Sequence, residues 1–392
     1  MPPQQDNGTF SSDDAPIIKL NGPAATDKHG RSPTLIKAVP SKYPYPMPFG
    51  LALIARITAV MVPSLFYVGP AILAAPIPVA LFVSSRAGMI MLTVALFLAF
   101  IPVKQWPYFR QFFQMWYELF DFHHNINLPL DPAKQEVDDK TLTIYATHPH
   151  GVIPIHGYLW CAFCDQHFPN RYGFGALTDI AMRLPLLRHV MGWLSSEPAQ
   201  KKVLLRRMDA GDNLYILPGG VAEIFAACPG RNVIKAPRRG LMKLALQTGG
   251  VLVPTYVFGA NDFYNQLATY GSNKTNAPSK GGEDPTNVLG QIQRKISRRF
   301  KGGFTFFWGQ YGLPLPYEVK CSMVLGDPIE PVPGTLGREK TKSGTKLTCT
   351  KIAEPTEEQI DELYIRYTDA LVRLFEQYKA EAGFPDAKLD IL

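Results

Sequence analysis

A long stretch without charge near the N-terminus constrains this 392-residue chain more than any other feature. No charged residue occurs from Ile57 to Val83, and a second uncharged run extends from Ala87 to Val103. A helix needs about 20 apolar residues to cross a bilayer, so the first run is long enough and the second is marginal. Four prolines in the first run predict that it does not form one straight, continuous helix.

The two runs predict a helical hairpin over residues 49–105 that enters the bilayer and returns to the same side, with its turn at Ser84–Arg86. Arg56 on one flank and Lys104 and Arg110 on the other favour the cytosol for both ends. A buried pair of helices in a soluble core is the alternative, and a re-entrant hairpin that does not cross fully remains open. The sequence therefore predicts a membrane protein, multi-pass or hairpin, that contacts membrane lipids.

The segments around the hairpin have a different composition. Residues 1–48 are polar and rich in proline, which predicts a disordered tail. The net charge of +7 fits a protein that lies against an anionic membrane or handles a polyanionic ligand. No basic arm, zinc finger or RNA-recognition signature occurs, so no nucleic-acid partner is expected. Five cysteines, an odd number, argue against a disulfide scaffold, and a homo-oligomer is compatible with the sequence.

Residues 106–392 alternate strand-like and helix-like segments. We predict strands at 141–146, 213–217 and 251–258, and helical segments at about 151–163, 221–226, 240–247 and 356–383. Gly271–Gly282 is predicted to be a polar loop. This alternation predicts an α/β domain with a mixed sheet and surrounding helices.

His148 and His150 lie where a predicted strand gives way to a helix, and Gly151 allows a sharp turn between them. A residue before proline is pushed towards an extended conformation, and positions two apart in an extended run point the same way. The two imidazoles are therefore expected on one side. Histidine suits a base that takes a proton from an alcohol near neutral pH. Structural or capping histidines are the alternative.

A second turn, Pro218-Gly219-Gly220, leads into a helix that carries Glu223. Two glycines let a backbone approach a ligand closely, and amides before a helix stabilise negative charge. Glu223 is a candidate to orient an imidazole or to hold a substrate hydroxyl. An ordinary turn without a functional role is the alternative.

Two other patterns are weighed as binding sites. Cys161 and Cys164, with His156 and His167 nearby, lie on one short apolar helix that cannot wrap a tetrahedral zinc ion, so structural thiols and no metal are expected. Several basic clusters are candidates to meet lipid head groups or the phosphates of coenzyme A. Among them, Arg239 and Lys243 lie four apart and share one face of a predicted helix.

Three enzyme signatures are missing from the sequence. It contains no Gly-x-Ser-x-Gly elbow, no phosphate loop ending in Gly-Lys-Ser/Thr, and no His-Glu-x-x-His metal helix. These absences argue against a serine hydrolase, a nucleotide-driven pump and a zinc protease.

The motifs together resemble the type 2 diacylglycerol acyltransferases, a group that includes monoacylglycerol and wax-ester synthesising relatives. The resemblance runs from about Tyr43 to Gly383. It rests on His148-Pro-His-Gly151, Pro218-Gly-Gly-x-x-Glu223, the segment Arg239–Gly259, Phe307-Trp-Gly309, Leu313-Pro-Leu-Pro316 and Gly326-Asp-Pro-Ile329.

The resemblance implies an acyltransferase-like fold that esterifies the free hydroxyl of diacylglycerol with acyl-CoA, a substrate, and needs no cofactor. It implies that His148 and His150 lie at the catalytic centre, where Glu223 is the candidate carboxylate partner. The candidates for substrate binding are Gly151, Gly219, Gly220, Arg239, Lys243, Asn261 and Asp262. It also implies an endoplasmic reticulum membrane enzyme of storage lipid synthesis whose domain, residues 106–392, faces the cytosol, with lipid droplets as a further location.

The chain departs from that family at two positions. Phe-Gly-Glu-Asn-Asp is usual at the end of the third strand, where this chain has Ala260 in place of glutamate, and Leu241 replaces a common phenylalanine. The acceptor stays open between diacylglycerol, monoacylglycerol and a long-chain alcohol. A hairpin protein that coats lipid droplets without catalysis is the alternative from another class.

Overall fold

The computed structural model describes residues 42–44, 46–124, 139–168, 171–267, 288–300 and 302–392. Most of the predicted tail, 1–48, and the predicted loop Gly271–Gly282 lie outside these residues.

A seven-stranded mixed sheet forms the centre of the molecule, in the order β1-β10-β7-β2-β5-β3-β4. Five neighbouring strands, from β7 to β4, run parallel, and β10 pairs with β7 antiparallel. In chain order the strands of this sheet are β1 (His123–His124), β2 (Thr143–His148), β3 (Phe174–Leu177), β4 (Ser196–Pro198), β5 (Leu214–Ile216), β7 (Val251–Phe258) and β10 (Ser322–Leu325). The mixed α/β fold expected from the sequence is confirmed.

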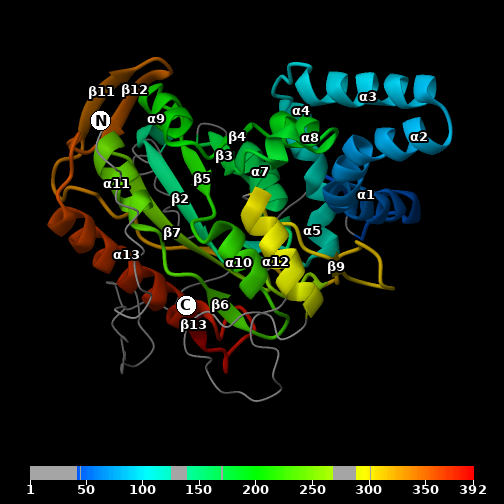
Figure 1. The fold of residues 1–392 in the computed structure, drawn as a ribbon. Helices are drawn as coiled ribbons and strands as arrows, with labels where there is room; N and C mark the ends of the chain where they lie inside the picture. Colours follow the sequence, from blue (N-terminus) through cyan, green and yellow to red (C-terminus); the bar gives the residue numbers. More distant parts are fainter. Residues whose placement is uncertain (1–41, 45, 125–138, 169–170, 268–287, 301) are drawn as a thin grey trace, which may run out of the picture.

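Helices cover both faces of the sheet (Figure 1). One face packs against the elements α4 (Pro107–Phe112), η1 (Phe113–Met115), α5 (Trp116–Leu119), α7 (Ile155–His167), η2 (Ala181–Arg183) and α8 (Leu187–Trp193). The other face packs against α9 (Lys201–Asp209), α11 (Arg239–Thr248) and α13 (Glu357–Tyr378). Alternation along β2 serves both layers, because Tyr145 faces the first and Ile144 and Ala146 face the second.

Smaller elements complete the chain. They are α10 (Gly220–Ala226), β6 (Asn232–Ile234), β8 (Asn265–Gln266), α12 (Val288–Phe300), β9 (Phe307–Trp308), β11 (Gly337–Thr341), β12 (Gly344–Thr348) and β13 (Leu389–Ile391). Strand β6 pairs in parallel with β13, and β11 and β12 form a hairpin.

The apolar runs form α1 (Phe49–Ala74), α2 (Pro76–Phe82) and α3 (Ser85–Phe100). The helical backbone continues past Pro63 and Pro70 and first changes at Ala75, so only the later prolines coincide with a break. Together α1 and α2 make a helical stretch of 34 residues, long and apolar enough to cross a membrane. Helix α3 turns back on α2 so closely that a Cβ on Gly88 would lie 2.4 Å from the Cβ of Ala80.

Helix α1 also packs against the α/β domain. Ala55, Ala59 and Val62 belong to the same hydrophobic core as α7 and α8. The hydroxyl of Tyr67 donates to the carbonyl of Phe307 at 2.8 Å and accepts from its amide at 2.7 Å. The segment predicted as a membrane tether therefore supplies part of the domain core.

Candidate active site

Glu223 and His148 form a fully buried pair behind the end of β2. Glu223 Oε1 lies 2.6 Å from His148 Nδ1, and neither side chain has exposed surface. The Pro-Gly-Gly turn makes this possible, because a Cβ on Gly219 would stand 1.9 Å from the Cδ of Glu223. The carboxylate folds back over a glycine that leaves it room. Gly219 is thus required for packing.

The same carboxylate fixes two backbone segments. Its Oε2 accepts from the amide of His150 at 2.8 Å, and its Oε1 accepts from the amide of Lys235 at 3.0 Å. An ionised carboxylate has lone pairs for all three bonds, and bonds of this kind are roughly twice as strong as neutral ones. Glu223 therefore joins the end of β2, the His150 loop and the segment after β6.

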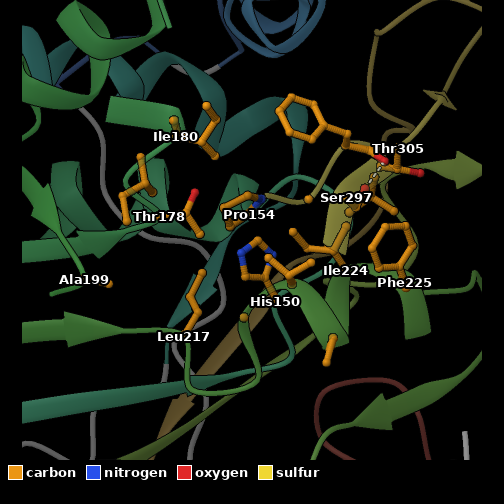
Figure 2. Close-up of a pocket in the computed structure, with 18 of the residues that line it drawn as sticks. His150, Pro154, Thr178, Ile180, Ala199, Leu217, Ile224, Phe225, Ser297 and Thr305 are labelled. Carbon is orange, nitrogen blue, oxygen red and sulfur yellow. Dashed lines mark hydrogen bonds between the residues drawn. The ribbon is translucent and has the colours of Figure 1, made fainter. Parts of the chain in front are cut away.

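His150 presents one ring nitrogen to a large cavity. Its Nδ1 lies 2.9 Å from the carbonyl oxygen of Gly151, which can only accept. The proton of the neutral ring is therefore on Nδ1, and Nε2 carries the lone pair of a base. Figure 2 shows the ring among Pro154, Leu217 and Ile224. Burial lowers the pKa of His150 below its ordinary value, so the ring is neutral at pH 7.

The cavity has a volume of about 1320 Å³ and is lined mainly by apolar side chains. Phe66, Tyr67 and Pro70 of α1 line one side, and α9 and α11 lie at the other (Figure 1). Among the described residues, the cations that line it come from this second side and from the segment after β6, and they are Lys201, Lys235, Arg238 and Lys243. A long apolar space with a cationic part matches an amphipathic anion such as a fatty acyl thioester of a phosphorylated carrier.

The two histidines do not share one side, as the sequence analysis expected. His148 ends β2, and its ring lies 6.5 Å from that of Tyr367 in α13, whereas His150 lines the cavity. Strand alternation stops at His148 because the chain then turns through Gly151, whose φ is +67°. A Cβ on Gly151 would stand 2.5 Å from the carbonyl oxygen of Ala260.

The glycine and lysine candidates are placed in different ways. Gly220 and Lys243 line the cavity. The amide of Gly220 already donates to the carbonyl of Leu217 at 3.0 Å, so it is engaged within the turn. Gly151 and Gly219 shape the backbone around Glu223 and His150 and do not line the cavity.

Three predicted substrate-binding residues lie away from the cavity. Arg239 forms ion pairs of 2.6 Å with Glu357 and Asp361 of α13, because a helical residue there faces that neighbouring helix. Asn261 donates to the carbonyl of Arg231 at 2.9 Å, and Asp262 accepts from the amide of Gly230 at 2.7 Å. The last two side chains hold the loop before β6.

Of the cavity cations, Lys235 was not predicted from the sequence, and Lys201 and Arg238 were considered only as members of basic clusters. Lys235 lines the cavity and directly follows β6, a short strand that pairs with β13 near the end of the chain. No local sequence pattern predicts this long-range pairing. Arg238 precedes α11 with an extended backbone, so its side chain departs from the helix face that carries Arg239. The helix was predicted to start at Gly240, and this start was the signal that Arg238 lies before the helix and does not share its face.

The Cys161–Cys164 segment is apolar in character. Burial raises the pKa of the Cys161 thiol to about 11 and that of Cys164 well above its ordinary value, so both are protonated at neutral pH. His156 is buried with its Nδ1 3.0 Å from the Tyr215 hydroxyl, and burial lowers its pKa to about 3. Within the described residues, no three histidine, cysteine or acidic side chains gather as a metal site.

Comparison with protein families gives one decisive match. The family model described as diacylglycerol acyltransferase matches residues 79–391, which is most of the chain and includes His148, His150 and Glu223. The chain belongs to the diacylglycerol acyltransferase family. The resemblance inferred from the motifs is thereby confirmed.

The diacylglycerol O-acyltransferases to which this chain is similar are distant relatives in sequence. Diacylglycerol O-acyltransferase 2 of Bos taurus is 28% identical over 259 residues, which span 63% of this chain and 63% of the bovine one. The namesake of Dictyostelium discoideum is 29% identical over 293 residues, 70% and 73% of the two chains. Diacylglycerol O-acyltransferase 2-like protein 6 of Homo sapiens is 27% identical over 292 residues, 72% and 75% of the two chains. The match thus spans less than two thirds of the bovine relative.

Among solved structures, the 1-acyl-sn-glycerophosphate (LPA) acyltransferase PlsC of Thermotoga maritima is similar with a TM-score of 0.34 and 11% identity. The alignment covers 81% of this chain and 98% of that one.

Proposed function

We propose that this family member transfers the acyl group of acyl-CoA to the free hydroxyl of diacylglycerol and so forms triacylglycerol. One observation carries the proposal: His150 presents a neutral imidazole to an apolar cavity that extends from a membrane-type helix to a group of cations. The names of the relatives support the choice of diacylglycerol as the acceptor.

Each part of the cavity suits a part of the two substrates. The acyl chain and the diacylglycerol chains occupy the apolar space beside α1, where they exclude water. The phosphates of coenzyme A meet Lys201, Lys235, Arg238 and Lys243, which are cations at the other side. This arrangement brings the thioester between them to the level of His150.

The reaction is a direct transfer. His150 Nε2 takes the proton of the acceptor hydroxyl as the hydroxyl oxygen attacks the thioester carbonyl carbon. The tetrahedral intermediate then collapses, the carbon–sulfur bond breaks, and the imidazolium returns the proton to the coenzyme A thiolate. Glu223 acts as a positioning residue, since it holds the His150 amide and does not line the cavity.

We further propose that the chain resides in the endoplasmic reticulum membrane, and on lipid droplets derived from it, with the α/β domain facing the cytosol. The helical stretch Phe49–Phe82 supports membrane association. Acyl-CoA is water-soluble and the acceptor stays in the bilayer, so a site between the two phases reaches both.

A direct test supplies the chain to cells that lack their own triacylglycerol synthesis. Their microsomes, given labelled acyl-CoA and diacylglycerol, are expected to form labelled triacylglycerol. His150→Ala is expected to lower the rate by roughly 10²- to 10⁴-fold, the usual contribution of a general base. Competing monoacylglycerol and long-chain alcohol identify the preferred acceptor. A fully active His150→Ala chain would end the assignment of the base, and an absence of any ester product would end the proposed function.

A further inference from the structure

Helix α12 carries an apolar strip that stays exposed among the described residues. Val288 is 70% exposed, Leu289 62%, Ile292 48% and Ile296 46%. The spacing from Leu289 to Ile292 and Ile296 is three and four residues, which puts these side chains on one face of the helix. Leu289, Ile292 and Ile296 also line the cavity, so the strip forms an open apolar edge of its mouth.

The polar face of α12 next to this strip is held by hydrogen bonds. Gln293 Nε2 donates to Thr305 Oγ1 at 2.8 Å, and Gln293 Oε1 accepts from the amide of Phe306 at 3.2 Å. Ser297 Oγ donates to the carbonyl of Phe304 at 2.8 Å. Because its polar face is fixed to this segment, the helix is presented with its apolar strip outward.

The segment that holds α12 also contacts the membrane-type helix α1. Tyr67 stacks on Phe307 with ring centroids 4.8 Å apart and on Phe306 at 6.4 Å, and Phe306 is itself 62% exposed. An exposed apolar surface therefore continues from α1 through Phe306 to α12. Residues of both helices line the cavity.

The charge of α12 indicates what covers its strip. Its sequence Val288–Phe300 holds four basic residues and no acidic one, and the side chains of Lys295 and Arg299 are exposed. An apolar face flanked by cations is typical of helices that lie in the interface of anionic membranes. A second copy of the helix would bring like charges together, which disfavours a contact between two chains.

We propose that α12 is a second membrane contact of this protein, lying in the interface of an anionic bilayer. The apolar strip enters the acyl boundary, and Lys295 and Arg299 meet lipid phosphates. The lipid acceptor then passes from the bilayer into the cavity between α12 and α1. The route of entry rests on the proposed function, whereas the membrane contact does not.

The test places an environment-sensitive fluorophore on Ile292→Cys in the full chain. Cys161 and Cys228, the two least buried of the five cysteines, are first replaced by serine. The protein is reconstituted in vesicles of phosphatidylcholine, with or without phosphatidylserine. We expect a blue-shifted emission that deepens with phosphatidylserine and is quenched by a quencher on the lipid chains. A matched probe at the exposed Lys340, in the hairpin at the far end of the molecule (Figure 1), is expected to remain in water.

Charge reversal gives a second readout. Each cation near an anionic surface strengthens the binding of the protein to the membrane. The double variant Lys295→Glu with Arg299→Glu is therefore expected to lower the rate with vesicle-borne acceptor by roughly tenfold or more in anionic vesicles. Lys340→Glu with Lys342→Glu carries the same charge change and is expected to leave the rate unchanged.

The outcomes separate the two proposals. A probe at position 292 that stays in water, or that shifts with protein concentration in detergent alone, overturns the membrane contact even if the chain makes triacylglycerol. A probe that enters the lipid in a chain without any turnover supports the contact and overturns the proposed function.

Discussion

At the scale of single residues, Glu223 connects several parts of the site through its hydrogen bonds. It is fully buried and bonds His148, the amide of His150 and the amide of Lys235. Both amides donate, one to each carboxylate oxygen, so the site needs an acceptor at Oε1 and at Oε2.

Glu223→Gln turns one of those acceptors into a donor that faces another donor. We expect a loss of about 1–3 kcal/mol in unfolding free energy, the usual cost of a buried unsatisfied group. We also expect kcat to fall by about tenfold or more while KM for acyl-CoA changes little, because Glu223 does not line the cavity. Thermal unfolding in detergent and steady-state kinetics measure both effects.

Glu357→Gln, at an exposed side chain, is the matched control and should leave both quantities unchanged. Unaltered kcat in Glu223→Gln would show that the His150 loop does not depend on this carboxylate.

The pH dependence of the rate follows from His150. The neutral ring is the active base, and burial lowers its pKa below the ordinary value of about 6.5. The rate should therefore be level from pH 7 to 8 and fall as the pH drops through that lowered pKa. Initial rates at saturating substrate measure this profile. A rate that continues to rise above pH 7.5 would contradict a neutral His150 at physiological pH.

At the scale of elements, the start of α11 separates two neighbouring arginines. Arg238 lines the cavity, and Arg239 pairs with α13. Arg238→Ala removes a cation from the proposed phosphate site and should raise KM for acyl-CoA by about tenfold, since bonds between charged groups contribute about 1.5–3 kcal/mol. Arg239→Ala breaks exposed ion pairs that contribute at most about 1 kcal/mol, and its KM should not change. Kinetics of the two variants measure this difference, and equal effects would contradict the proposed binding mode.

The strands also show which element bounds can be predicted from the sequence. Strand β7 has the predicted bounds, 251–258, because a mostly apolar run bounded by glycines indicates a buried strand. Strand β2 was predicted to end at Ala146, but it continues to His148, because Thr147 and His148 pair with Thr255 and Tyr256. Such pairing depends on a strand more than a hundred residues away in the sequence. Because Thr147 and His148 are polar, the apolar pattern that predicts a buried strand does not include them.

The site shows the same division. His148, His150 and Glu223 were predicted from local turns, and the structure brings them together. Arg239 was predicted from its helical spacing to Lys243, and Asn261 and Asp262 from a motif, and neither signal says which neighbour a side chain meets. That neighbour is α13 for Arg239 and the loop before β6 for the other two.

At the scale of the whole molecule, α1 is both an apolar helix and a wall of the core. Ala55 and Ala59 have no exposed surface, whereas Met61 on the same helix is 60% exposed. Ala55→Leu or Ala59→Leu adds methylene groups to a packed contact and should cost about 1–3 kcal/mol of stability. Met61→Leu changes only the exposed side and should be neutral. Thermal unfolding in detergent compares them, and equal midpoints for all three variants would show that the domain folds independently of α1.

The contacts of α1 have a consequence for how the protein folds during its synthesis. Arg56 bonds Glu318 and Tyr67 bonds Phe307, partners that lie 262 and 240 residues later in the chain. At ordinary speeds of synthesis, the helix waits on the order of ten to fifty seconds for them. In the proposed membrane setting, α1 therefore enters the bilayer before its partners in the domain have been synthesised. The α/β domain would then complete its core by folding against a helix that is already in place.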